Sequence, residues 1–147
     1  MFDNKKGFTL IEILIAISFI SVVFLISLYS LKGLAPDLEL SGTARELATD
    51  LRYAQQTSIT EQADYCIKMF FDLKKYQVIK CDESQIILEK VLPGYISGFF
   101  STVFAGDKIE FNPYGAVKES GTVTFTNTNN RAKTVDIKAS GFVKIND

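Results

Sequence analysis

One carboxylate at the start of an apolar segment is the feature of this sequence that most clearly indicates chemistry. Glu12 lies in the stretch KKGFTLIEIL, residues 5–14, and no charged residue follows it before Lys32. A lone carboxylate in hydrocarbon costs several kcal/mol, and a positively charged partner relieves much of that cost. Either the segment lies outside a membrane, or Glu12 needs a partner that this chain does not supply.

The usual residues of catalysis and metal binding are scarce. The chain of 147 residues has no histidine, and its only cysteines are Cys66 and Cys81. A histidine-based triad or metal site is therefore excluded, and the sequence contains no phosphate-binding loop or nucleophile motif. We predict a protein that is not an enzyme and has no cofactor or metal. The alternative, a membrane-anchored enzyme, would need a polar cleft with paired carboxylates. The net charge of −1 does not by itself indicate a nucleic-acid partner.

The apolar segment is long enough to cross a bilayer. Residues 13–31 carry no charge over 19 positions, which corresponds to about 28 Å of helix. A secretory signal peptide has a shorter apolar region, and the following LKGLAP offers no small-x-small cleavage site. A plain anchor with Lys5 and Lys6 on the cytoplasmic side accounts for the length but leaves Glu12 unexplained.

The stretch KKGFTLIE, residues 5–12, resembles the cleavage and methylation motif of type IV prepilins and of the pseudopilins of type II secretion. The resemblance implies that a dedicated prepilin peptidase cuts between Gly7 and Phe8 and that Phe8 is then N-methylated. It also implies a role for Glu12, the fifth residue after the cut. Its carboxylate pairs with the new amine of Phe8 in a neighbouring subunit and sets the axial register of a filament.

The resemblance also predicts where the protein resides. The leader, residues 1–7, contains the basic residues Lys5 and Lys6 and stays in the cytoplasm. Residues 8–34 form a single-pass helix that anchors the protein in the cytoplasmic membrane before assembly and lies in the core of a pilus or pseudopilus afterwards. The C-terminal domain lies outside the cytoplasm. The expected partners are the membrane, the prepilin peptidase/methyltransferase and other pilin or pseudopilin subunits.

A second, amphipathic helical segment is predicted over residues 35–62. Small and apolar residues recur every three or four positions and so describe one face of a helix. The face comprises Leu40, Ala44, Leu47, Leu51, Ala54 and Ser58. We expect it to cover a β-sheet rather than to bind an outside partner. Gly33 and Pro36 predict a kink or short break between the apolar and the amphipathic segments.

Residues 63–147 are predicted to form a β-rich globular domain. Apolar and β-branched runs, separated by Gly, Pro and Asn turn signals, indicate several strands. They are DYCIKMFF, KKYQVIKC, SQIILEKVL, VFAGDKIEFNP, GTVTFTNT, RAKTVDIKA and GFVKI. The stretch YISGFFSTVF, residues 95–104, fits a strand, a buried loop or a filament contact, and we expect a core role. A helix followed by such strands resembles the GspH/FimT group of minor pilins and pseudopilins. That implies an α+β fold, with a long N-terminal helix packed on a small, mostly antiparallel β domain.

The two cysteines are placed to form an intrachain disulfide. A hairpin centred on Leu73 and Lys74 sets Cys66 directly opposite Cys81. Opposed strand positions bring Cβ atoms within about 4.5–5.5 Å, close to disulfide reach, and disulfides persist outside the cytoplasm. The alternatives are two reduced cysteines, or a β-bulge that breaks the pairing.

Two functions are compatible with these features. The first is a structural subunit, a minor pilin or pseudopilin of a type IV pilus or type II secretion pseudopilus, serving protein secretion, pilus priming or DNA uptake. The second is DNA binding by a FimT-like minor pilin of natural competence, with Arg131, Lys133 and Lys138 as the candidate contacts. Acidic residues are interleaved with these cations, and cations on a sheet face are commonly only solvated.

Overall fold

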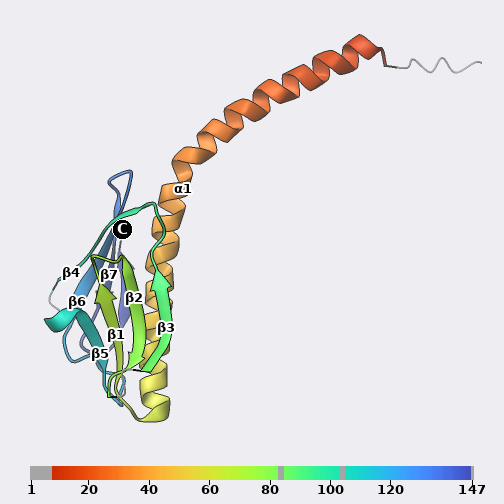
Figure 1. Cartoon of the computed structure of the whole chain (residues 1–147). Coiled ribbons are helices and arrows are strands. Elements are labelled where there is room, and N and C mark those ends of the chain that lie inside the picture. Colours follow the sequence, from red (N-terminus) through yellow and green to blue (C-terminus); the bar gives the residue numbers. More distant parts are fainter. Residues whose placement is uncertain (1–7, 83–84, 103–104, 147) are drawn as a thin grey trace, which may run out of the picture. The chain divides into compact units, whose positions relative to one another are not determined.

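The computed structural model describes residues 8–82, 85–102 and 105–146, and within these residues one long helix precedes eight strands (Figure 1). The chain divides into two compact units, residues 1–35 and 36–147. The first unit is helical from Leu10 onward, and the second combines the remainder of the helix with the strands.

Helix α1 spans Leu10–Glu61 without interruption. The predicted short break at Gly33 and Pro36 is therefore wrong, while the alternative of a kink stays a prediction. The boundary between the two units falls directly before Pro36. Proline removes one backbone hydrogen bond of a helix, because its nitrogen carries no hydrogen. The Pro36 side chain is buried in the second unit, and that burial offsets the lost bond.

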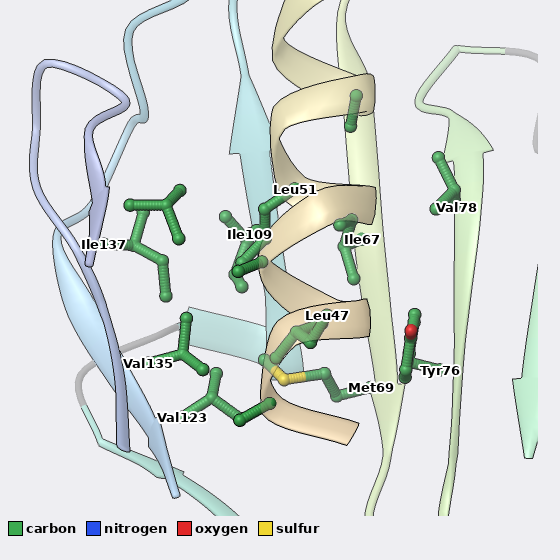
Figure 2. Close-up of a cluster of buried hydrophobic side chains, with 14 of the residues drawn as sticks. Leu47, Leu51, Ile67, Met69, Tyr76, Val78, Ile109, Val123, Val135 and Ile137 are labelled. Atoms are coloured by element: carbon green, nitrogen blue, oxygen red, sulfur yellow. The ribbon is translucent and has the colours of Figure 1, made fainter. Parts of the chain in front are cut away.

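The amphipathic half of α1 buries the face that its periodicity predicts. All six residues of that face are at most 2 % exposed. They are Leu40, Ala44, Leu47, Leu51, Ala54 and Ser58. Figure 2 shows Leu47 and Leu51 among buried side chains of the strands, so the expectation that this face covers a sheet is confirmed.

The strands form two four-stranded sheets, ordered β3-β2-β1-β5 and β4-β6-β7-β8. The first sheet consists of β1 (Tyr65–Phe70), β2 (Lys75–Lys80), β3 (Gln85–Val91) and β5 (Lys108–Phe111). The second consists of β4 (Ile96–Thr102), β6 (Gly121–Asn127), β7 (Ala132–Ile137) and β8 (Val143–Asn146). A short 3-10 turn, Ala105–Asp107, precedes β5. Neighbouring strands are antiparallel in both sheets, so the predicted α+β fold with its antiparallel β domain is confirmed.

The segment of uncertain role, residues 95–104, contributes strand β4 to the second sheet. Its Ile96 is fully buried and Phe99 is 7 % exposed. The Phe99 ring stacks on Phe125 of β6 with a centroid distance of 5.3 Å. The expected core role is therefore confirmed, while Phe100 points away from the core and is 49 % exposed.

The β1–β2 hairpin differs from the predicted register by two residues. Phe70 pairs with Lys75, so the loop comprises residues 71–74 and lies one residue earlier than in a hairpin centred on Leu73 and Lys74. Phe71 lies in this loop, and its ring packs against Phe99 of the other sheet at a centroid distance of 4.8 Å. That contact joins residues far apart in the sequence, so the local strand pattern does not reveal it.

The Cys66–Cys81 disulfide is present despite the shifted register. Cys66 lies opposite Ile79, and the Cys81 N–H donates to the Asp64 carbonyl at 2.9 Å. The cysteines are therefore diagonal neighbours rather than directly opposed, as we had predicted. Their Cα atoms are 5.4 Å apart, a separation that a disulfide bridges readily. The predicted bond is confirmed and the predicted opposition is wrong.

Candidate assembly site

Glu12 lies in the first turn of α1, where it forms reciprocal hydrogen bonds with Thr9. The Thr9 N–H and hydroxyl both donate to Glu12 Oε2, each at 3.4 Å, and the Glu12 N–H donates to Thr9 Oγ1 at 3.3 Å. This is a capping box, in which each side chain satisfies a backbone N–H that the helix start leaves without a partner. A carboxylate in the first turn is also favoured by the helix dipole.

Sequence analysis missed Thr9, although the signal is present. The pattern Thr-x-x-Glu before an apolar run is a known helix-start signature, and the chain contains it as TLIE, residues 9–12. Thr9 is therefore a hydrogen-bonding partner of Glu12 within this chain. Thr9 supplies hydrogen-bond donors, but not the positive charge that would neutralise the carboxylate. In the part of the chain that the structure describes, Glu12 has no ion pair.

The helix surface that follows Glu12 is apolar all round. The window Leu10–Ser27 has a mean hydropathy of 2.7 over 18 residues, and none of it is buried within the protein. The hydroxyls of Ser18, Ser21 and Ser27 donate to carbonyls four residues earlier at 2.8, 2.8 and 3.0 Å. Because these bonds satisfy the hydroxyls inside the helix, the segment fits hydrocarbon or a bundle of other apolar helices.

The predicted processing site lies at the edge of what the structure describes. Lys5, Lys6 and Gly7 fall outside the described residues. Phe8 is described, and it is 81 % exposed. Cleavage after Gly7, methylation of Phe8 and the pairing of Glu12 with a neighbouring amine stay predictions.

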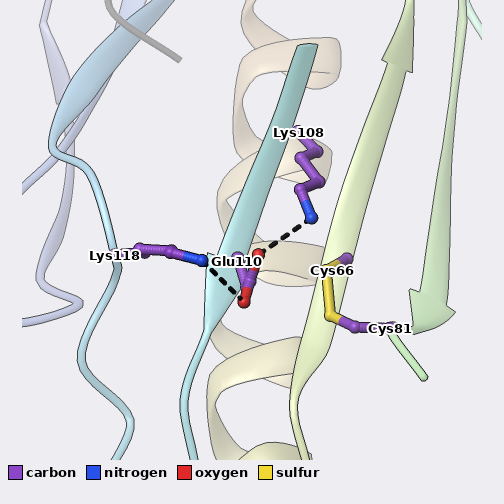
Figure 3. Close-up of a disulfide and its surroundings, with 5 residues drawn as sticks. All are labelled: Cys66, Cys81, Lys108, Glu110 and Lys118. Atoms are coloured by element: carbon purple, nitrogen blue, oxygen red, sulfur yellow. Dashed lines mark ion pairs between the residues drawn. A yellow bond between two sulfur atoms is a disulfide. The ribbon is translucent and has the colours of Figure 1, made fainter. Parts of the chain in front are cut away.

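The disulfide lies beside a small ion cluster on the first sheet (Figure 3). Lys108 Nζ is 2.9 Å from Glu110 Oε2, and Lys118 Nζ is 3.6 Å from Glu110 Oε1. The hydrogen bond from Lys108 is the main cause that lowers the pKa of Glu110. Cys66 is the cross-strand partner of Glu110. The disulfide joins strand β1 to the residue after β2, and the ion cluster joins strand β5 to the segment before β6. We therefore assign both a structural role.

Asp37 connects the helix to the loop between β6 and β7. Asn127 Nδ2 donates to Asp37 Oδ1 at 2.7 Å, and Arg131 Nη1 is 2.9 Å from Asp37 Oδ2. Asn127 is fully buried, and its Oδ1 accepts the N–H groups of Asn129 and Arg131 at 3.0 and 2.9 Å. Sequence analysis did not find this connection, because 90 positions separate Asp37 from Asn127.

The structure brings together two of the three candidate DNA contacts, and the third lies apart from them. Arg131 and Lys133 line one open hollow of about 440 Å³, and Asp37 lines it too. The Arg131 charge is therefore paired within the chain. Lys138 lies just past the other end of β7, about 23 Å along the strand from Arg131. The described residues also contain no group of three His, Cys, Asp or Glu side chains that could hold a metal ion.

A capped apolar helix that continues into an amphipathic half on two antiparallel sheets defines a pilin-like subunit. The N-terminal segment, residues 2–28, matches the prokaryotic N-terminal methylation motif. Residues 43–141 match the family described as type II transport protein GspH. The chain belongs to this family of minor pseudopilins and pilins.

Solved structures and a curated relative agree with the family. The structure is similar to the minor pseudopilin EpsH of the type 2 secretion system of Vibrio cholerae, with a TM-score of 0.64 and 12 % sequence identity. The match covers 74 % of this chain and 96 % of that chain. It is also similar to the type IV minor pilin FimU of Pseudomonas aeruginosa, with a TM-score of 0.62 and 12 % sequence identity. That match covers 76 % of this chain and 90 % of that chain. Competence protein ComGD of Bacillus subtilis (strain 168) is 27 % identical over 122 residues, which cover 82 % of this chain and 80 % of the relative.

Proposed function

We propose that this chain is a structural filament subunit that is cut between Gly7 and Phe8, methylated at Phe8, and assembled with other subunits of its family. One observation carries the proposal: an exposed apolar helix, opened by Thr9 and Glu12, is continuous with the amphipathic helix that covers the β domain. Such a helix needs cover on all sides, which a membrane supplies before assembly and other helices supply afterwards.

The proposed topology is a single-pass protein of the cytoplasmic membrane. The basic leader, with Lys5 and Lys6, stays in the cytoplasm, and the unit of residues 36–147 lies outside it. The Cys66–Cys81 bond supports this placement, because disulfides persist in oxidising compartments. The proposed role is structural rather than catalytic, and it needs no cofactor.

The proposal is tested on the protein recovered from its native host. Mass spectrometry of the N-terminal peptide is expected to begin at methylated Phe8, without residues 1–7. Recovery of an active subunit that still carries the leader would overturn the proposal.

Three variants separate the two things that Glu12 can do. If its charge pairs with a neighbouring amine, Glu12→Gln removes the charge while keeping a side chain that can cap the helix, and we expect loss of filament incorporation with normal membrane insertion. Glu12→Val should behave in the same way. Thr9→Ala disrupts the capping box but keeps the charge, so incorporation should largely persist. A Glu12→Gln subunit that assembles normally would contradict charge pairing.

A second candidate function, a subunit of a DNA-uptake filament, is favoured by the similarity to a protein named for competence. Deleting the chain in its host should then abolish uptake of added DNA while leaving protein secretion intact. A loss of secretion with normal DNA uptake would assign it to a secretion pseudopilus instead.

Direct DNA binding is a separate question from the type of filament. The Arg131–Asp37 ion pair and the distance to Lys138 give little support to one continuous basic surface. The test is a gel shift of DNA by residues 36–147 at several salt concentrations, with Arg131→Ala and Lys133→Ala as variants. Salt-dependent binding that these changes abolish would establish DNA contact.

A further inference from the structure

The two halves of the disulfide differ in how accessible they are. Cys66 lies inside strand β1, which is bonded to β2 on one side and to β5 on the other, and it is only 1 % exposed. Cys81 comes directly after the last residue of β2, in the turn that begins there, and it is partly exposed. Of the two cysteines, Cys81 therefore borders a turn, while Cys66 is enclosed by ordered strands.

Side chains on the same face of the sheet surround Cys66. Its cross-strand neighbours are Ile79 of β2 and Glu110 of β5. Glu110 is held in place by ion pairs with Lys108 at 2.9 Å and with Lys118 at 3.6 Å (Figure 3). Because Cys66 is almost completely covered, a reagent can reach its sulfur only after such neighbours have moved apart.

Thiol–disulfide exchange depends on which sulfur an incoming thiolate can reach. The thiolate forms a mixed disulfide with the sulfur that it attacks, and the other sulfur leaves as a thiolate. In the folded domain burial protects Cys66, so attack is directed to Cys81 Sγ. The released Cys66 stays covered and close to Cys81, because the Cα atoms of the two residues are 5.4 Å apart.

We propose that Cys81 is the exchange cysteine of this domain, that Cys66 is its resolving cysteine, and that the partner is an exported dithiol–disulfide oxidoreductase. In the oxidising direction, the Cys81 thiolate attacks the disulfide of the oxidoreductase, which breaks and releases one thiolate. The Cys66 thiolate then attacks Cys81 Sγ, which forms the Cys66–Cys81 bond and releases the second thiolate. The two thiols of this chain lose two electrons and two protons, and the disulfide of the partner becomes a dithiol.

Formation and opening of the bond share one intermediate, because a reaction and its reverse pass through the same states. The mixed disulfide on Cys81 is therefore expected both when the oxidoreductase makes the bond in the folded domain and when a reductant opens it. The inference goes beyond the proposed function. It rests on the proposed placement of the domain outside the cytoplasm, where disulfides are made, and it does not require filament assembly.

The first test uses the unchanged, oxidised full chain in detergent, with glutathione as the attacking thiol. After acid quenching and alkylation of free thiols, trypsin places Cys66 in the peptide of residues 53–68 and Cys81 in the peptide of residues 81–90. Mass spectrometry should find glutathione on Cys81 at least about tenfold more often than on Cys66. The matched control is the same chain in concentrated urea, where burial is lost and the ratio should approach one.

Three results of this test would overturn the inference. They are equal labelling of the two cysteines in the folded chain, preferential labelling of Cys66, and the absence of any glutathione adduct until the chain unfolds. Because the protein is unchanged, none of these results can be attributed to a variant that fails to fold.

Two single variants test the partner in the native host. Cys66→Ser removes the resolving cysteine, so a reducible adduct should accumulate, and mass spectrometry should identify its second protein as an oxidoreductase with a Cys-x-x-Cys pair. Cys81→Ser keeps only the buried cysteine and should trap at least about tenfold less. Equal trapping by both variants, or none by Cys66→Ser, would contradict the assignment. The mass of the mature N-terminus is read separately, so a retained leader would count against the proposed function alone.

Discussion

Replacing Cys66 and Cys81 together by serine tests how the β domain is held together. The bond closes a loop with a sequence separation of 15. In the chain-entropy treatment a loop of that size restricts the unfolded state by about 10 cal/mol/K, or about 3 kcal/mol at 25 °C. Since folded domains of this size have a total free energy of unfolding of roughly 5–15 kcal/mol, we expect the loss to be a large fraction of stability.

The assay is urea unfolding of residues 36–147, produced in an oxidising compartment and followed by circular dichroism. With a denaturant slope of roughly 1.5 kcal/mol/M, the midpoint should fall by about 2 M in the double-serine variant. The matched control is the unchanged protein under reducing conditions, which loses the bond but keeps both sulfur side chains. If the variant and the reduced protein both unfold within about 0.3 M of the oxidised protein, the reasoning from loop closure is refuted.

Three further predictions concern single positions. Gly141→Ala should lower the free energy of unfolding by more than about 1 kcal/mol, because the φ is 81° and a Cβ would meet Gln55 and the Gly115 carbonyl. Gly42→Ala lies in the helix with open space around it, and it should raise the free energy of unfolding by about 0.5–1 kcal/mol. Urea unfolding measures both changes. Asn127→Ala should cost about 2 kcal/mol in the same assay, since it leaves buried donors and acceptors unmatched. Glu110 has a lowered pKa in the folded state, so its ionised side chain should stabilise the fold above about pH 4.5, and this stabilisation should be lost as the pH falls below that value. Glu110→Gln should flatten that part of the curve of unfolding free energy against pH.

The predictions fail in different ways. A Gly141→Ala protein as stable as the Gly42→Ala protein would show that the loops that carry Gly115 and Gly141 can move apart without a loss of stability. An unchanged stability in Asn127→Ala would mean that water replaces its side chain. If the free energy of unfolding of the Glu110→Gln protein still falls steeply between pH 5 and 3, carboxylates other than Glu110 cause the loss of stability at low pH.

Local patterns were enough to predict the apolar segment and the buried face of helix α1. The position of Glu12 after a basic leader, the length of the apolar segment and the buried face from Leu40 to Ser58 all follow from residue type and helical spacing. Each depends on residue types and spacings along a single helix, so the sequence carries the information directly. The Thr9–Glu12 capping box belongs to the same class and was available from its spacing.

Only the tertiary structure decided how the β domain is assembled. The hairpin loop places Phe71 against Phe99 of the other sheet, and Pro36 is buried inside a continuous helix. The Asp37–Arg131 ion pair and the hydrogen bond from Gln55 to the Gly115 carbonyl join residues that are 60 or more positions apart. Such contacts are set by the packing of whole elements, and the local spacing of residue types does not encode which partners will meet.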